Sequence, residues 1–309
     1  IWHRRGIRWA GRRRMGLLDK GIRDSLASNR CAPADEVKPI LRCAEALSAL
    51  GLQKEATDLL EASLTAFPGN EAAINKKKQV LAPKRILRVG EGKEFASIMA
   101  AVRVAPPGAE ILVDAGIYQE PVFLTKPVTI RSNTVSSDYA AIGSLDGADK
   151  SPWPEIRVIG NNAIVCASPL TTPVHVIGFR IVCQGDPKLS LHAVRVVSGV
   201  VVLRNYSATS SSGPVIAAEN DKTRLIMQTC AVHSGAQGGI LAAANAELSL
   251  HQVHCTRNAA NGLELREGSS AVADACHFYS NGRQGIIVWH GAGPVSYTHP
   301  ALPTVHPVL

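Results

Sequence analysis

Short runs of aliphatic and β-branched residues, separated by Gly, Asn and Ser, dominate the second part of the chain. Such runs begin at Ile240, Leu263 and Ile286, so the last two steps are each 23 residues long. The preceding runs begin at Val194 and Ile216, which gives steps of 22 and 24 residues. Nearly equal steps between strands too short for hairpins are typical of a solenoid.

Equal steps allow each short strand to pair with the equivalent strand of the next turn, about 4.8 Å away. Inward side chains then stack in columns and form a core of aligned aliphatic residues. The pattern therefore predicts a mainly β fold, a parallel β-helix of roughly nine coils over residues 86–293.

Two pairs of residues recur at the predicted corners of this coil. Asn258 and Asn281 share one position of successive repeats, and Gly262 and Gly285 share another. Asparagine suits a corner either as a left-handed residue or through a ladder of side-chain amides. We therefore expect these four residues to form a structural turn ladder.

The spacing of apolar residues becomes helical in the first part of the chain. Ile40, Cys43, Ala44 and Leu47 recur at a 3.6-residue period, which predicts one buried stripe on a helix. A second amphipathic helix and a short third helix follow before Leu81. Residues 31–82 are thus predicted to form a small α-helical hairpin unit, separate from the coil.

The helical spacing resembles one tetratricopeptide repeat. Ile40, Ala44 and Leu47 stand where that motif usually has Trp, Gly and Tyr. Small residues at Ala56 and Ser63 would let the two helices approach closely. A single copy cannot bury its own face, and a plain helical hairpin is an equally good interpretation.

The first predicted coil carries a more specific resemblance. Phe95–Val102 predicts a short amphipathic capping helix, and the runs PPGAEILV, GIYQEPV and KPVTI follow it. This opening resembles the pectin-lyase-type right-handed parallel β-helix superfamily, which includes pectin esterases and the β-helix repeats of F-box receptor proteins. The resemblance implies a right-handed coil and a role either in polysaccharide chemistry or in substrate recruitment. No F-box is evident in the sequence.

Composition narrows the class of protein. Hydrophobic residues at 46% and charged residues at 19% exclude a disordered chain. No run of 18 apolar residues is present, so we expect no membrane partner. Seven cysteines without a CxxC pair, and no secretory signal, indicate reduced thiols in the cytoplasm or nucleus.

The net charge of +8 comes mainly from six arginines within residues 1–14, since the rest has 27 basic and 25 acidic residues. A nucleic-acid partner is therefore expected only if residues 1–14 belong to the native protein. Residues 1–30 are interpreted as a basic, disordered leader or a fragment end. Residues 294–309 break from the repeat and resemble translated adapter sequence, so they are interpreted as a non-native tail.

Acidic residues are too sparse in the coils to assign a reaction centre. Cleavage of a glycosidic bond needs two carboxylates about 5 to 10 Å apart. Asp274 is almost alone in its coil, and Glu264 and Glu267 flank Arg266 on a strand and turn predicted to be exposed. We assign no catalytic residue and expect no cofactor.

Two further groups of residues are candidates for binding. His254 and His277 are predicted to share a column, with Cys230 at the equivalent place one coil earlier. These side chains either pack as a stack or supply ligands to a metal such as zinc. The second candidate is a surface formed by residues from the last two coils: Glu264, Arg266, Trp289 and His290.

These observations favour a non-catalytic intracellular scaffold or substrate-recruitment module with a protein partner, because repeat folds present extended faces. The alternative is a carbohydrate-active or carbohydrate-binding protein of the pectin-lyase type, of the lyase, esterase or epimerase kind, with a polysaccharide as partner.

Overall fold

A computed structural model describes residues 38–49, 53–81, 85–134, 153–169, 172–289 and 291–298. The chain divides into two compact units, residues 1–83 and residues 84–309. The leader predicted at residues 1–30 lies outside the described residues. No helix among the described residues is both long enough and apolar enough to cross a membrane.

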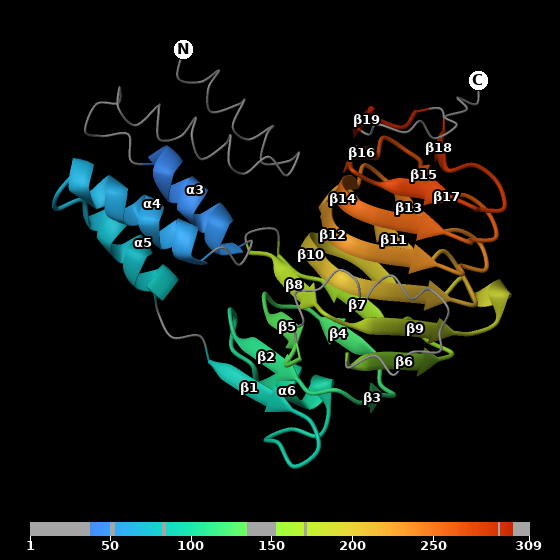
Figure 1. The fold of residues 1–309 in the computed structure, drawn as a ribbon, viewed down its shortest axis with the longest axis horizontal. Helices are drawn as coiled ribbons and strands as arrows, with labels where there is room; N and C mark the ends of the chain where they lie inside the picture. The colour runs from blue at the N-terminus through green and yellow to red at the C-terminus, as the bar shows by residue number, and fades with distance from the viewer. Residues whose placement is uncertain are drawn as a thin grey trace. The chain divides into compact units, whose positions relative to one another are not determined.

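The first unit consists of helices α3 (Lys38–Ala49), α4 (Gln53–Ala66) and α5 (Glu71–Leu81) (Figure 1). Ile40 and Leu47 of α3 pack against Leu60 of α4 in one buried cluster. Ala44 and Ala56 are completely buried in it, and their small side chains let the two helices pack closely. The predicted helices are therefore present, and their assignment to a tetratricopeptide repeat stays a prediction.

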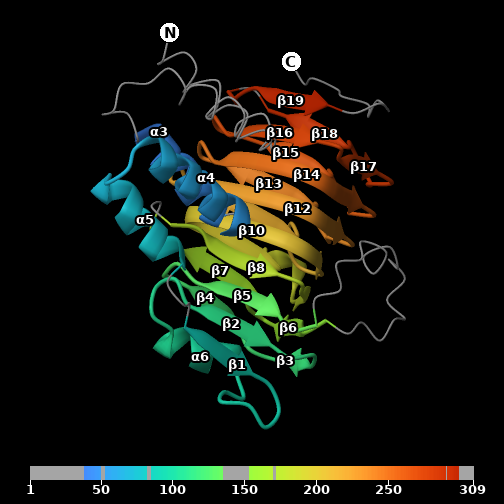
Figure 2. The ribbon, with the colours of Figure 1, turned by 60° about the vertical axis from the view of Figure 1, so that its left-hand side comes forward.

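The second unit is a coil of three parallel sheets (Figure 2). Sheet 1 stacks β4 (Val122–Leu124), β7 (Ile164–Ala167), the start of β10 (Val194–Ser210), β11 (Ile216–Glu219), β13 (Ile240–Ala243), β15 (Leu263–Leu265) and β18 (Ile286–Val288). Sheet 2 stacks β1 (Ile86–Val89), β2 (Glu110–Val113), β5 (Thr129–Ser132), β8 (Val174–Ile177), the middle of β10, the first parts of β12 (Thr223–His233) and β14 (Glu247–Thr256), β16 (Ser270–Asp274) and β19 (Val295–Thr298). Sheet 3 stacks β3 (Ile117–Tyr118), β6 (Glu155–Ile159), β9 (Arg180–Gln184), the ends of β10, β12 and β14, and β17 (His277–Tyr279).

The predicted repeat matches the observed register. Ile216 pairs with Ile240, Ile240 with Leu263, and Leu263 with Ile286. All four side chains are at most 1% exposed, and they form one aliphatic column inside the coil. Burial of each contributes about 1.5–3 kcal/mol. The described part of the second unit makes about eight turns, close to the predicted nine.

The corner between sheets 2 and 3 is made by left-handed backbone. Asn205, Thr229, Gln252 and Ala275 have φ values of 48°, 58°, 52° and 51° at equivalent places in four successive turns. The sequence analysis left open whether Asn258 would play this part. Asn258 and Asn281 instead lie at the next corner, between sheets 3 and 1.

Side-chain amides form the ladder at that second corner. Asn258 Nδ2 donates to Asn281 Oδ1 at 2.9 Å, and the Gly235 amide donates to Asn258 Oδ1 at 2.8 Å. Beside the ladder, a Cβ on Gly262 would lie 2.5 Å from the Gly285 carbonyl oxygen. Glycine is thus required there because successive turns approach closely.

The first turn is closed by helix α6 (Ile98–Val104), and a short 3₁₀ helix, η2 (Pro187–Leu189), lies in a later turn. Ser97 Oγ accepts a hydrogen bond from the Ala100 amide, and Glu120 accepts from the Ile98 amide at 2.5 Å and the Met99 amide. Glu120 therefore stabilises the N-terminus of the helix, where a negative charge is favourable.

The end of the coil differs from the prediction that the pattern breaks at residue 294. Strand β19 pairs with β16, with Val295 opposite Ala271. Backbone pairing needs only an extended chain, and the residues after Pro294 supply one. The described stacking therefore extends to Thr298, and the interpretation of residues 294–309 as a non-native tail stays a prediction.

The amide ladder predicts a specific loss of stability. Asn258→Ala leaves the buried Gly235 amide without its acceptor, so we expect the free energy of unfolding to fall by about 2–3 kcal/mol. Urea unfolding followed by circular dichroism measures this change. Asn161→Ala is the control, because Asn161 is exposed and its side chain bonds only the neighbouring amide. Equal stability of both variants would contradict the ladder's role.

Candidate functional site

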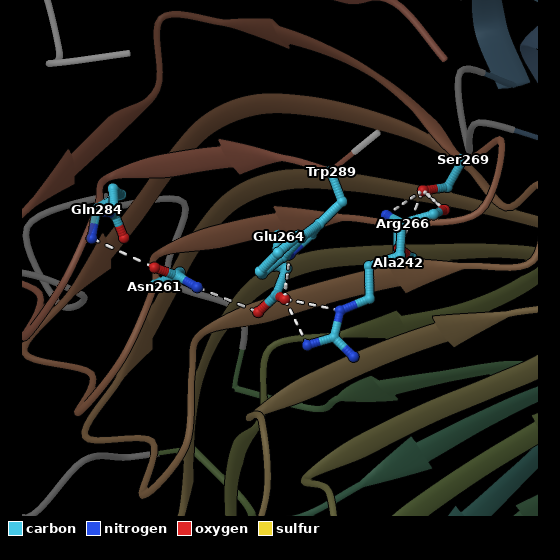
Figure 3. Close-up of polar contacts among 7 residues, drawn as sticks. All are labelled: Ala242, Asn261, Glu264, Arg266, Ser269, Gln284 and Trp289. Carbon is cyan, nitrogen blue, oxygen red and sulfur yellow. Dashed lines mark hydrogen bonds and ion pairs between the residues drawn. The ribbon is translucent and has the colours of Figure 1, made fainter. Parts of the chain in front are cut away.

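A group of polar side chains surrounds an exposed indole on the outer surface of sheet 1 (Figure 3). Glu264 points outward because its neighbours on β15, Leu263 and Leu265, are buried in the coil. Its Oε1 accepts from Trp289 Nε1 at 2.6 Å and from Arg266 Nε at 2.7 Å. Its Oε2 accepts from Asn261 Nδ2 at 3.2 Å. We call Asn261, Glu264, Arg266 and Trp289 the Trp289 cluster.

These contacts fix the indole in place. The Arg266 guanidinium carbon lies 5.8 Å from the centroid of the Trp289 ring, within range of a cation–π interaction. Asn261 Oδ1 accepts from the Gln284 amide, and Ser269 Oγ accepts from the Arg266 amide. The ring is nevertheless 42% exposed. The cluster therefore presents a rigid aromatic surface to solvent.

The carboxylate of Glu264 is fully engaged by its neighbours in the cluster. Glu264 already accepts three hydrogen bonds, one of them from a guanidinium that neutralises its charge. A general acid or base needs a free position facing the reacting proton. Within the described ranges, no three metal-ligating side chains converge on one point. His290, predicted as part of this surface, lies outside the described residues.

The predicted alignment of Cys230 with the two histidines is wrong. His254 pairs with His277, and their ring centroids are 4.8 Å apart on the outer face of sheet 3. The residue opposite His254 on the other side is Ala231, whereas Cys230 pairs with Val253 and is buried inside the coil. Burial raises the pKa of the Cys230 thiol, which opposes formation of a thiolate ligand.

The wrong alignment of Cys230 with His254 assumes a step of 24 residues, and that step does not apply in sheet 3. The sheet 1 step from Glu219 to Ala243 is 24 residues, whereas the step from Arg224 to Glu247 is 23. The extra residue therefore lies in the turn between β11 and β12, and it does not affect sheet 3. A shift of one residue moves a side chain to the opposite face of a strand.

Sequence reasoning missed a polar group on sheet 3. Ser207 Oγ lies 3.0 Å from His233 Nε2. Burial lowers the pKa of His233 to about 4, and the nearby guanidinium groups of Arg257 and Arg180 act in the same direction. His233 pairs with Thr256, so the 23-residue step could have placed it on this face.

Comparisons with known proteins agree with this architecture. Residues 188–299 match a family model described as "Right handed beta helix region". The match and the parallel register identify the second unit as a right-handed parallel β-helix, the class predicted from the opening coil. A comparison with curated protein sequences found no match.

Three solved structures are among those that resemble parts of this chain. Pectin methylesterase PemA from Erwinia chrysanthemi has a TM-score of 0.43 and 15% identity, covering 68% of this chain and 72% of its own. The Aspergillus niger pectin methylesterase in deglycosylated form has a TM-score of 0.42 and 11% identity, covering 73% and 85%. Pectate lyase Pel9A has a TM-score of 0.40 and 11% identity, covering 67% and 68%.

The surroundings of His233 predict a dependence of stability on pH. Its pKa is about 4 in the folded protein and about 6.5 in an unfolded chain. As the pH falls, the unfolded state therefore binds a proton before the folded state does. The free energy of unfolding is highest above about pH 6.5 and decreases as the pH falls towards 4. Urea unfolding between pH 4 and 7 measures this slope.

His233→Gln should make that slope shallower, because glutamine does not titrate. Burial also lowers the pKa of His192 and His254, so part of the slope should remain. An identical slope in the variant and the original protein would contradict the assignment to His233.

Proposed function

We propose that the chain is a non-catalytic binding module whose Trp289 cluster is the centre of a surface for a protein partner. The observation that carries this proposal is the exposed indole held by Glu264 and Arg266. Trp and Arg are the residue types most enriched among those that dominate binding energy at protein interfaces. A side chain that is already fixed loses little conformational entropy on binding.

The residues around the cluster support a protein partner. Leu241 and Ile287 lie on either side of Glu264 in the outward row of sheet 1. Leu241 is half-buried and Ile287 is 5% exposed, so the charged pair lies within an apolar surrounding. An apolar centre with an aromatic residue and an arginine is typical of interface cores.

The buried thiols support a reducing compartment. Six cysteines in the described part of the chain are buried: Cys43, Cys166, Cys183, Cys230, Cys255 and Cys276. Free thiols are usual in cytosolic and nuclear proteins. We therefore propose the cytoplasm or the nucleus as the compartment of the module.

A carbohydrate ligand is the second candidate, and one observation favours it. The exposed Trp289 ring lies beside the Arg266 guanidinium and near the Asn261 amide. An apolar sugar face can pack on an indole, while the guanidinium can pair with the carboxylate of an acidic sugar. Two of the similar solved structures, a pectin methylesterase and a pectate lyase, are named for pectin substrates. For this chain, a polysaccharide ligand is only the second candidate.

Removal of the indole separates these alternatives. Trp289→Ala should reduce nuclease-resistant capture of partner proteins by more than tenfold, because truncation of a central Trp costs about 2 kcal/mol or more. Quantitative mass spectrometry of proteins retained by the immobilised chain measures the change. Tyr279→Ala is the matched control, since Tyr279 is a 48% exposed aromatic residue on sheet 3.

Equal capture by the original chain and Trp289→Ala would reject the protein-binding proposal. Trp289-dependent retention of oligogalacturonate on a glycan array would favour the carbohydrate candidate instead. Release of unsaturated products, reducing ends or methanol from pectin would reject a non-catalytic role altogether.

A further inference from the structure

A cavity of about 400 Å³ opens where sheet 1 turns into sheet 2. Three successive turns of the coil contribute to it, through the segments that follow the first part of β10, β11 and β13. Its lining residues are Val197, Glu219, Asn220, Asp221, Ala244 and Asn245. Most of its accessible lining is apolar, and two carboxylates, Glu219 and Asp221, lie at its edge.

The cavity lies in the same row of the coil as the Trp289 cluster. Glu219 pairs with Ala243, and the ladder continues from the Arg266 amide to Ala242 and from the Trp289 amide to Leu265. Glu219, Ala243, Arg266 and Trp289 thus occupy equivalent positions in four successive turns. Three spacings of 4.8 Å place Trp289 about 14 Å from Glu219 along the coil.

Between Glu219 and Trp289 the row contains one small side chain, Ala243, and one long side chain, Arg266. Ala243, the residue between Glu219 and Arg266, has only a methyl side chain and is half-buried. An extended segment could therefore lie along the row without meeting a bulky side chain at this position. Extended chain rises about 3.3 Å per residue, so 14 Å corresponds to about four residues.

The charges of the cavity indicate what it can hold. Glu219 is compensated by Arg195, with Nη2 and Oε2 2.8 Å apart. Asp221 is exposed and forms no ion pair with any residue of the described ranges, its neighbour Lys222 included. One uncompensated carboxylate among amide groups complements a single cation that carries several N–H donors, as lysine and arginine side chains do.

We propose that the sheet 1 surface binds an extended segment of a partner protein, with a lysine or arginine of that segment paired with Asp221. The basic residue lies four or five positions from the partner residue that contacts Trp289. This inference rests on the proposed function, and it specifies the chemistry of the partner. The two contacts, at Trp289 and at Asp221 beyond the Glu219 end of the row, would fix both the direction and the register of the bound segment.

Selection from a phage library of random linear 12-residue peptides tests this proposal. On the original chain, enriched peptides should carry Lys or Arg four or five residues from an aromatic or large apolar residue. Asp221→Asn should lower the enrichment of that basic position at least fivefold, because it removes the charge and keeps the shape. Asp58→Asn, which removes an equally exposed carboxylate from α4, should leave the enrichment unchanged.

The same selection separates this inference from the proposed function. Peptides whose binding depends on Trp289 but not on Asp221, or that lack a basic residue at this spacing, would overturn the inference and leave the proposed function standing. Peptides that bind Trp289→Ala as well as the original chain, or no enrichment on the original chain, would reject both. Circular dichroism of each variant checks that the coil is folded.

For an enriched peptide, replacement of its basic residue by norleucine provides a second measurement. We expect a five- to tenfold rise in the Kd for the original chain, measured by fluorescence polarisation. The same replacement should change the Kd for Asp221→Asn by less than twofold, since the two groups act as a pair. An equal loss with both proteins would overturn the pairing with Asp221.

Discussion

Backbone pairing between successive turns determines the position of every other feature of the coil. The hydrogen bonds that place Leu263 between Ile240 and Ile286 also place Glu264 between Leu241 and Ile287. The aliphatic column keeps this register, because a slip of one residue would expose the column and turn Glu264 inward. The buried hydrophobic residues therefore hold the surface residues in alignment as well as stabilising the fold.

Two of the corners in each turn bend at left-handed residues, and one of them adds a ladder of side-chain amides. Ser234, Arg257 and Ser280, directly before Gly235 and the two ladder asparagines, have φ values of 55°, 55° and 53°. At the corner between sheets 2 and 3, the backbone itself bends at a left-handed residue such as Gln252. At the next corner, side-chain amides of Asn258 and Asn281 satisfy backbone groups that the bend leaves unpaired. The second arrangement needs a particular side chain, whereas the first tolerates Asn, Thr, Gln or Ala.

The stacking could be predicted from the sequence because it depends on spacing, which is visible along the chain. Glu264, Arg266 and Trp289 could be assigned to a surface because alternation on short strands separates outward from inward positions. The misplacement of Cys230 has a specific cause: the step length alone does not reveal in which turn an extra residue lies. The cavity beside Asp221 was equally hidden, because it is formed by connections between strands that differ in length from one turn to the next.

The position of Trp289 along the stack has a consequence for its dynamics. Strand β18, directly before Trp289, pairs with β15, and no strand of the described ranges pairs with its other edge. A strand that pairs along one edge opens more readily than a strand that pairs along both edges. Separation of β18 from β15 would carry the indole away from Glu264. A ligand bound to this ring therefore also stabilises the pairing of β18 with β15. Occupancy of the surface and protection of the β18 amides from hydrogen exchange are therefore thermodynamically linked.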